Sequence, residues 1–96
     1  MQVNQQTQQQ LQVKADDKTL AGAYANTAQV QFTKEEFVID FMNMFPPIAT
    51  LNARVILSPG HTKRLANVLK DLVEKYEAQH GAVEASADPG EIGFRG

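Results

Sequence analysis

The sequence predicts an α+β fold: an antiparallel meander of three to four strands, followed by one long C-terminal helix packed on the sheet, in an oligomeric protein. Two strand-like segments, residues 22–33 and 36–45, flank a short polar connection. A helical apolar stripe follows between Ser58 and Gly81. The segment 36–45 is apolar on both of its faces, whereas a strand with one face in water alternates cleanly. We therefore expect a partner, most simply a second copy, to cover its second face.

Composition predicts one small domain between two polar ends. The chain has 96 residues, no cysteine and a formal net charge of -2. We expect a disordered Gln-rich N-terminus over residues 1–10, a single α+β domain over residues 11–81 and a flexible tail over residues 82–96. A core of this size is marginal by itself, and oligomerisation is one usual remedy where disulfides are absent.

Charge and hydropathy restrict the partners and the compartment. No apolar run approaches the roughly 20 residues that cross a bilayer. The first ten residues are uncharged and rich in Gln, unlike a secretory signal. We expect a cytoplasmic protein that does not contact membranes, and the negative balance argues against broad attraction to nucleic acid.

A hairpin is predicted at residues 33–36. Closing the chain there places Phe32 near Phe37, Val30 near Ile39 and Ala28 near Phe41. All these side chains then lie on one face, as register selection requires. A short fourth strand is expected at Leu11 and Val13, followed by a turn at Asp16-Asp17.

The third strand is predicted after Pro46-Pro47, which cannot continue a paired strand. Leu51, Ala53, Val55 and Leu57 alternate with Asn52, Arg54 and Ile56. Folding the chain back about Pro47 places Arg54 opposite Asp40 on the second face of the sheet.

The helix has clear start and stop signals. Ser58 is the expected N-cap, Pro59 lies in the first turn, and Gly81 is the expected C′ residue. Apolar residues recur at spacings of three and four and form one stripe: Leu65, Val68, Leu69, Leu72, Val73 and Tyr76.

Two sets of residues follow from this arrangement. The predicted core joins the first sheet face to the helix: Val30, Phe32, Phe37, Ile39, Phe41, Val55, Leu57, Leu65, Leu69, Leu72, Val73 and Tyr76. The predicted interface between copies lies on the second sheet face: Val38, Asp40, Met42, Met44, Arg54 and Ile56.

Asp40 has two interpretations, because it is a carboxylate inside an apolar strand. A buried carboxylate with a raised pKa is a candidate general base. The structural interpretation, a partner for Arg54 at an oligomer seam, is favoured, because no nucleophile or second titrating group lies near it. His61 and His80 are too far apart to share a metal and the chain has no cysteine, so we expect no metal site. The sequence shows no catalytic constellation, so we also expect no catalytic residue and no cofactor.

The start of the helix is a weaker candidate. Free N–H groups after Ser58, together with Lys63 and Arg64, are compatible with an anion. The spacing is not that of a phosphate loop, and almost every helix start has unsatisfied donors.

These observations predict a non-catalytic, homo-oligomeric protein-binding or scaffolding module, a dimer or tetramer. Met42 and Met44 suit adaptable contacts. If self-association does not consume their surface, we expect it to hold an apolar segment of a client protein, as an export chaperone does. The alternative is a small dimeric regulator that binds nucleic acid through Lys63, Arg64 and their neighbours.

Several blocks of the sequence carry a resemblance: Tyr24-Ala25-Asn26, then Glu35 to Phe41, then Ser58-Pro59 with His61 and Lys63-Arg64-Leu65, and finally Tyr76-Glu77 with Gly81. Over residues 11–81 the chain resembles a bacterial and archaeal family of small proteins, domain-of-unknown-function family 3467. The resemblance implies a strand-rich unit followed by one long helix, and no activity, substrate or cofactor. A looser likeness, of architecture alone, is to export chaperones with a helix behind an antiparallel sheet.

Overall fold

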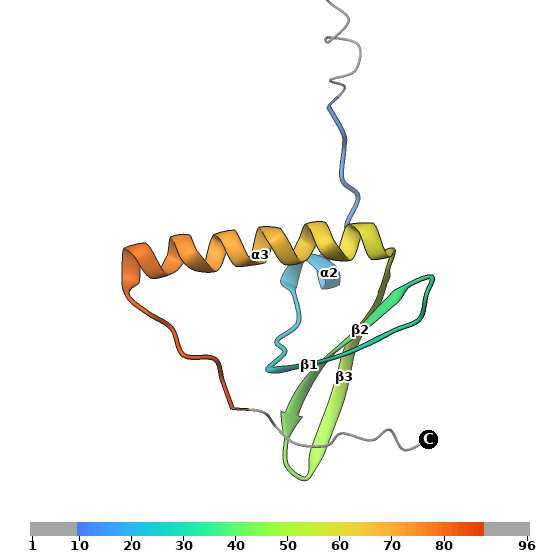
Figure 1. Cartoon of the computed structure of the whole chain (residues 1–96). Coiled ribbons are helices and arrows are strands. Elements are labelled where there is room, and N and C mark those ends of the chain that lie inside the picture. The colour runs from blue at the N-terminus through green and yellow to red at the C-terminus, as the bar shows by residue number, and fades with distance from the viewer. Residues whose placement is uncertain (1–9, 88–96) are drawn as a thin grey trace, which may run out of the picture.

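The α+β fold is confirmed. A computed structural model describes residues 10–87 of the chain. The elements follow one another as α2 (Asp17–Ala21), β1 (Thr27–Phe32), β2 (Phe37–Phe45), β3 (Ile48–Leu57) and α3 (Pro59–His80) (Figure 1). The strands form an antiparallel sheet in the order β1-β2-β3. Of the predicted Gln-rich disorder over residues 1–10 and the predicted tail over residues 82–96, residues 1–9 and 88–96 lie outside the described residues.

The β1–β2 hairpin has the predicted register. Phe32 pairs with Phe37, Val30 with Ile39, and Ala28 with Phe41. In the turn, Thr33 closes the loop, because its N–H donates to the Glu36 carbonyl at 2.9 Å and its Oγ1 accepts from the N–H groups of Glu35 and Glu36. The rings of Phe32 and Phe37 stack with centroids 5.4 Å apart.

The β2–β3 hairpin turns at Pro46-Pro47, joined by a cis peptide bond. Phe45 pairs with Ile48 on either side of this turn, so β3 begins three residues before the predicted Leu51. Asp40 pairs with Arg54 as predicted. The strand pairing was therefore accessible from the apolar pattern and the position of the two prolines.

The predicted N-terminal strand is wrong. Residues 10–16 form no strand, and a short helix, α2, follows them. The Oδ1 atom of Asp16 accepts from the N–H of Thr19 at 2.8 Å, so Asp16 is an N-cap and not a turn residue. An Asp three residues before a free helical N–H forms this cap locally, and this local bond favours a helix over a strand that has no neighbour.

The α3 helix begins and ends as predicted. Ser58 Oγ accepts from the N–H of His61 at 3.1 Å, and Pro59 occupies the first helical turn. Gly81 ends the helix at φ 97°, a backbone conformation that favours glycine, and its N–H donates to the Glu77 carbonyl at 2.8 Å.

The packing of α3 along the sheet, in contrast, is not found. No residue of α3 is buried, and neither α2 nor α3 shares more than a marginal contact with a strand. Figure 1 shows α3 starting at the end of β3 and running out past the sheet. The cause is the connection, because Ser58 alone separates β3 from α3, which is shorter than the roughly 2–6 residues that usually turn a chain back between a strand and a helix.

The predicted core is consequently open. Of its members Leu57 is buried, whereas Phe37, Ile39, Phe41 and Leu65 are half-buried. The remaining seven are exposed: Val30, Phe32, Val55, Leu69, Leu72, Val73 and Tyr76. The most enclosed side chains lie instead on the second sheet face, where Met42 is 1% exposed and Asp40 is 5% exposed.

Candidate functional site

A polar row crosses the second face of the sheet. Gln29 of β1, Asp40 of β2 and Arg54 of β3 are cross-strand neighbours. The Nε of Arg54 donates to Asp40 Oδ1 at 2.6 Å, and its Nη2 donates to Oδ2 at 3.0 Å, a bidentate pair. The Oε1 atom of Gln29 is buried and has no hydrogen-bond partner within the described residues.

The environment of Asp40 matches its structural interpretation. The hydrogen bonds from Arg54 hold the pKa of the Asp40 carboxyl below its ordinary value, although desolvation acts in the opposite direction. The same bonds raise the pKa of Arg54. A carboxylate with a lowered pKa is ionised near neutral pH and is a poor proton acceptor, so this geometry favours an ion pair over a general base.

The six residues of the predicted interface all lie on this second face, but they differ in access. Met42 and Asp40 are buried, Val38 and Met44 are half-buried, and Arg54 and Ile56 are exposed. An interface here stays a prediction, and its accessible surface is smaller than the sequence implies. A charged substitution at the buried Met42 would destabilise the fold, so its effect on assembly could not be separated from its effect on folding.

A β-bulge in β3 changes the surface in a way that sequence reasoning missed. Phe41 pairs with Ala53 but Met42 pairs with Leu51, so Asn52 is an extra residue in β3. Leu51 therefore lies on the second face beside Met42, not on the first face with Val55. The alternation of apolar residues continues through this point, so it contained no signal for the bulge.

Two asparagine side chains hydrogen-bond the segment before β1 to β2 and β3. The Nδ2 of Asn26 donates to the Met44 carbonyl at 3.0 Å, and its Oδ1 accepts from the Met44 N–H at 2.7 Å. The Asn26 amide thereby substitutes for one more peptide group in the β1–β2 ladder. From β3, Asn52 Nδ2 donates to the Tyr24 carbonyl at 2.5 Å. These bonds give a structural reason for the Tyr24-Ala25-Asn26 block.

Asn26→Ala is expected to lower the free energy of unfolding by about 1–2 kcal/mol, because two hydrogen bonds to the backbone of Met44 are lost. Denaturant unfolding followed by circular dichroism measures the change. The control is Asn67→Ala on the exposed surface of α3, where we expect a change within about 0.5 kcal/mol. Equal effects of the two substitutions would contradict the role assigned to Asn26.

The first face of the sheet exposes large apolar side chains. We call these residues the apolar sheet face: Val30, Phe32, Phe45, Ile48 and Val55. Their cross-strand pairing with Phe37, Ile39 and each other places them on one face. Phe32 is 73% exposed and Phe45 is 81% exposed. Phe32 lies near the start of β2 and Phe45 at its end, with Asn43 between them on this face. Large exposed apolar surface marks sites of protein or ligand binding.

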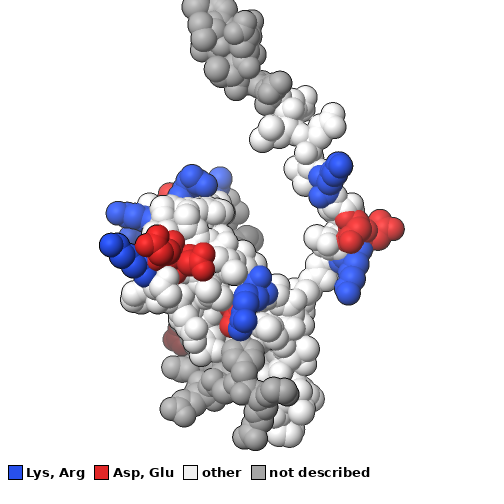
Figure 2. Space-filling model, turned by 90° about the vertical axis from the view of Figure 1, so that its right-hand side faces the viewer, with Lys and Arg blue, Asp and Glu red and all other residues white. Residues whose placement is uncertain are grey.

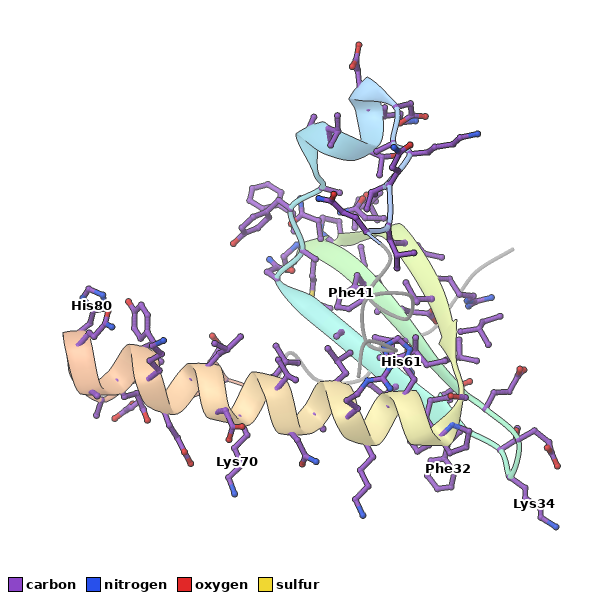
Figure 3. The ribbon with its side chains drawn as sticks, turned by 90° about the horizontal axis from the view of Figure 1, so that it is seen from above. Phe32, Lys34, Phe41, His61, Lys70 and His80 are labelled. Atoms are coloured by element: carbon purple, nitrogen blue, oxygen red, sulfur yellow. The ribbon has the colours of Figure 1, made fainter. Side chains whose placement is uncertain are left out.

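The apolar stripe of α3 is a second uncovered surface. Val68, Leu69, Leu72, Val73 and Tyr76 are each 46–54% exposed. Figure 3 shows His61 and His80 pointing to the side of α3 on which the sheet lies, and Lys70 pointing to the opposite side. The stripe lies on the same side as the two histidines, because Leu65, Leu69, Leu72 and Tyr76 continue their spacing of three and four.

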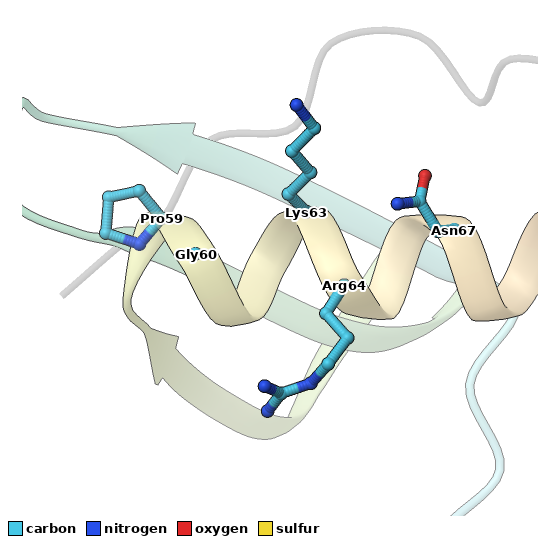
Figure 4. A pocket seen from close by; sticks show the side chains of 5 residues that line it. All are labelled: Pro59, Gly60, Lys63, Arg64 and Asn67. Carbon is cyan, nitrogen blue, oxygen red and sulfur yellow. The ribbon is translucent and has the colours of Figure 1, made fainter.

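The start of α3 borders a shallow hollow. Pro59, Gly60, Lys63, Arg64 and Asn67 line it (Figure 4). Lysine and arginine side chains alternate with acidic ones on the face shown in Figure 2, so this view contains no continuous basic surface. At the other end of the helix, the ring of His80 packs on Tyr76 with centroids 4.7 Å apart, far along α3 from His61.

Metal ligation and membrane crossing are considered for residues 10–87, the described part of the chain. Within this range no group of three or more His, Cys, Asp or Glu side chains is placed to hold a metal ion. No helix within the described part of the chain has the length and hydropathy required to cross a membrane.

Comparison with known proteins identifies a family. A family profile described as "Protein of unknown function (DUF3467)" matches residues 1–85. The match extends over nearly the whole chain and agrees with the resemblance drawn from the sequence blocks. No curated protein and no solved structure matches the chain.

Proposed function

We propose that this chain, which belongs to the DUF3467 family of unknown function, is a non-catalytic, self-associating protein-binding module. In this proposal it holds apolar segments of other proteins. The observation that carries the proposal is the apolar sheet face. A large exposed apolar patch, in contrast to a single exposed apolar side chain, marks a surface that another molecule binds.

The edges of the sheet support the same function. β1 and β3 each pair with β2 only, within the described residues. Protected edge strands usually carry charges or proline, whereas β1 has neither and β3 has a single charged residue, Arg54. An extended segment can pair with such an edge through its backbone and place alternate side chains against the apolar sheet face.

The test is binding of an unfolded polypeptide. We expect fluorescein-labelled, reduced and carboxymethylated α-lactalbumin to bind the full chain in fluorescence anisotropy, and Phe32→Asp to weaken this binding by about tenfold or more. The reason is that a charge at Phe32 would have to lose its hydration against an apolar segment.

Gln31→Asp is the matched control, since Gln31 directly precedes Phe32 in β1, is exposed and lies on the other face. It adds the same charge and is expected to leave binding within about twofold. Absence of binding by the wild-type chain, or equal effects of the two variants, would contradict a client site on the apolar sheet face.

A small dimeric nucleic-acid-binding regulator is the second candidate. The observation in its favour is the hollow at the start of α3, where Lys63 and Arg64 lie together. It ranks below the first candidate because of the mixed charges on the neighbouring surface. Binding to a DNA duplex that weakens steeply with rising salt would favour this candidate.

A further inference from the structure

The α3 helix has 22 residues and an apolar stripe that nothing covers within the described chain. A helix gains most of its stability from packing of its apolar face, so this stripe requires a cover. We propose that the cover is a second copy of the chain: two α3 helices pack antiparallel about a two-fold axis that passes between Lys70 and Asp71. This inference rests on the self-association in the proposed function and identifies its surface.

The spacing of the stripe is self-complementary. Leu69 lies as far before the point between Lys70 and Asp71 as Leu72 lies after it. The same relation joins the remaining members of the stripe in pairs: Val68 with Val73, and Leu65 with Tyr76. Every apolar residue therefore meets an apolar residue of the other copy. A two-fold interface requires this property, because each copy uses the same patch.

The positions also fit a helical seam. Leu65, Leu69, Leu72 and Tyr76 are separated by four, three and four residues, which is the spacing of alternating d and a positions in a coiled coil. Val68 and Val73 flank this seam on either side and widen it. The stripe is thus arranged to receive a helix.

Charge favours the antiparallel orientation as a long-range effect, because the charged residues that distinguish the two halves of α3 do not flank the seam. The first half of α3 carries Lys63 and Arg64 and no acidic residue, whereas the second half carries Asp71, Glu74 and Glu77 against two lysines. Antiparallel pairing places each basic half beside the acidic half of the other copy. It also sets the positive end of one helix dipole beside the negative end of the other. Parallel pairing would bring like halves together.

The available area is sufficient for a specific contact. Five stripe residues are about half exposed and Leu65 is less so, so their complete burial removes at most on the order of 500 Å² per copy from water, or about 1,000 Å² in total. Specific interfaces bury at least about 1,000 Å², whereas most crystal contacts bury less than about 800 Å².

The chain has no native cysteine, so single cysteines report the orientation directly. A mixture of Leu65→Cys and Tyr76→Cys chains, one of them carrying a tag, is expected to form the mixed disulfide under mild oxidation. Leu65→Cys alone is not expected to cross-link, because its two copies lie about 16 Å apart along the antiparallel pair, beyond the roughly 7 Å limit for a disulfide. Efficient cross-linking of Leu65→Cys with itself would overturn the antiparallel arrangement.

Light scattering on size exclusion tests the surface itself. The wild-type chain is expected at twice the mass of one copy, and Leu69→Asp/Leu72→Asp at the mass of one. The control, Asn67→Asp/Ala78→Asp, adds the same charges on the opposite side of α3 and is expected to keep the double mass. Circular dichroism of the strand region checks that the sheet persists in the monomeric variant.

The outcomes for pairing and for client binding are distinct. A wild-type monomer, or a dimer that survives Leu69→Asp/Leu72→Asp, overturns the pairing. If the wild-type chain in either case still binds the unfolded lactalbumin, and Phe32→Asp weakens this binding, the client site is supported without the α3 pairing. A dimer with the expected mixed disulfide that binds no lactalbumin supports the pairing and contradicts the client site.

Discussion

Met42→Ala is expected to lower the free energy of unfolding by about 2–5 kcal/mol. Met42 is the largest fully buried side chain of the described residues, and it lies between Thr27 and Leu51 on the second sheet face. Truncation removes the buried thioether and leaves a cavity that this small sheet closes only in part. Small domains have about 5–15 kcal/mol in total, so the loss is a large share of the stability. Denaturant unfolding measures it.

Met44→Ala is the control for this prediction. Met44 is the next residue on the same face and is half-buried, so we expect a loss of about 1 kcal/mol. Both variants are compared with the wild type at one protein concentration, because association of copies makes the apparent stability concentration-dependent. Equal losses for the two methionines would mean that the interior of the sheet is not centred on Met42.

Arg54→Met is expected to reverse the sign of the pH dependence that Asp40 contributes to stability. In the wild type the folded pKa of Asp40 lies below its ordinary value of 3.8. Its contribution is therefore present above pH 3.8 and is lost as the pH falls through the folded pKa. Without Arg54, desolvation remains and the pKa of Asp40 rises above the unfolded value. The variant then loses stability as the pH rises from 3.8 through the new folded pKa.

The comparison variant is Arg54→Met/Asp40→Asn, in which the titrating carboxyl is absent. The difference between the single and the double variant isolates Asp40 from other groups, including Asp16, whose pKa is also lowered in the fold by its bonds to Thr19. Unfolding free energies from pH 2 to pH 7 provide the test. Parallel curves for the two variants would mean that desolvation does not raise the pKa of Asp40 once Arg54 is absent. The raised pKa of Arg54 contributes nothing new in this range, because Arg54 is protonated throughout.

The proposed α3 pairing would also explain why this chain exposes apolar surface that a small domain usually covers. In a pair, each copy covers the stripe of the other, and the apolar sheet face remains for clients. Self-association and client binding then use separate surfaces of the same small fold, which is why their tests give independent answers.

Much of the fold was accessible from local patterns. The hairpin register follows from the apolar sets at Val30, Phe32 and Phe37, since a slip of one residue would move them to opposite faces. The Asp40–Arg54 pair follows from that register and from the position of Pro47. The bounds of α3 follow from Ser58 and Gly81. Each of these depends on residues that are close in sequence or directly opposite in a ladder.

The bulge and the Asn26 contacts were not accessible in this way. Leu51 to Leu57 keep an unbroken alternation, so no change of period marks Asn52. Its hydrogen bond to Tyr24 joins residues 28 positions apart, and the bond from Asn26 to Met44 spans 18 positions. Such contacts exist only after the strands have been placed beside one another.

The sequence by itself therefore determined the three strands of the meander, the bounds of α3, the register of the β1–β2 hairpin and the pairing of Asp40 with Arg54. It did not determine α2, the start of β3 or the bulge at Asn52. Periodicity, capping and turn chemistry act over a few residues, so one sequence is enough to infer them. Only the tertiary structure decided which face is enclosed. The single residue between β3 and α3 directs the helix away from the first sheet face, so its stripe and that face stay exposed. Burial depends on how whole elements lie relative to one another, and no local pattern encodes that placement.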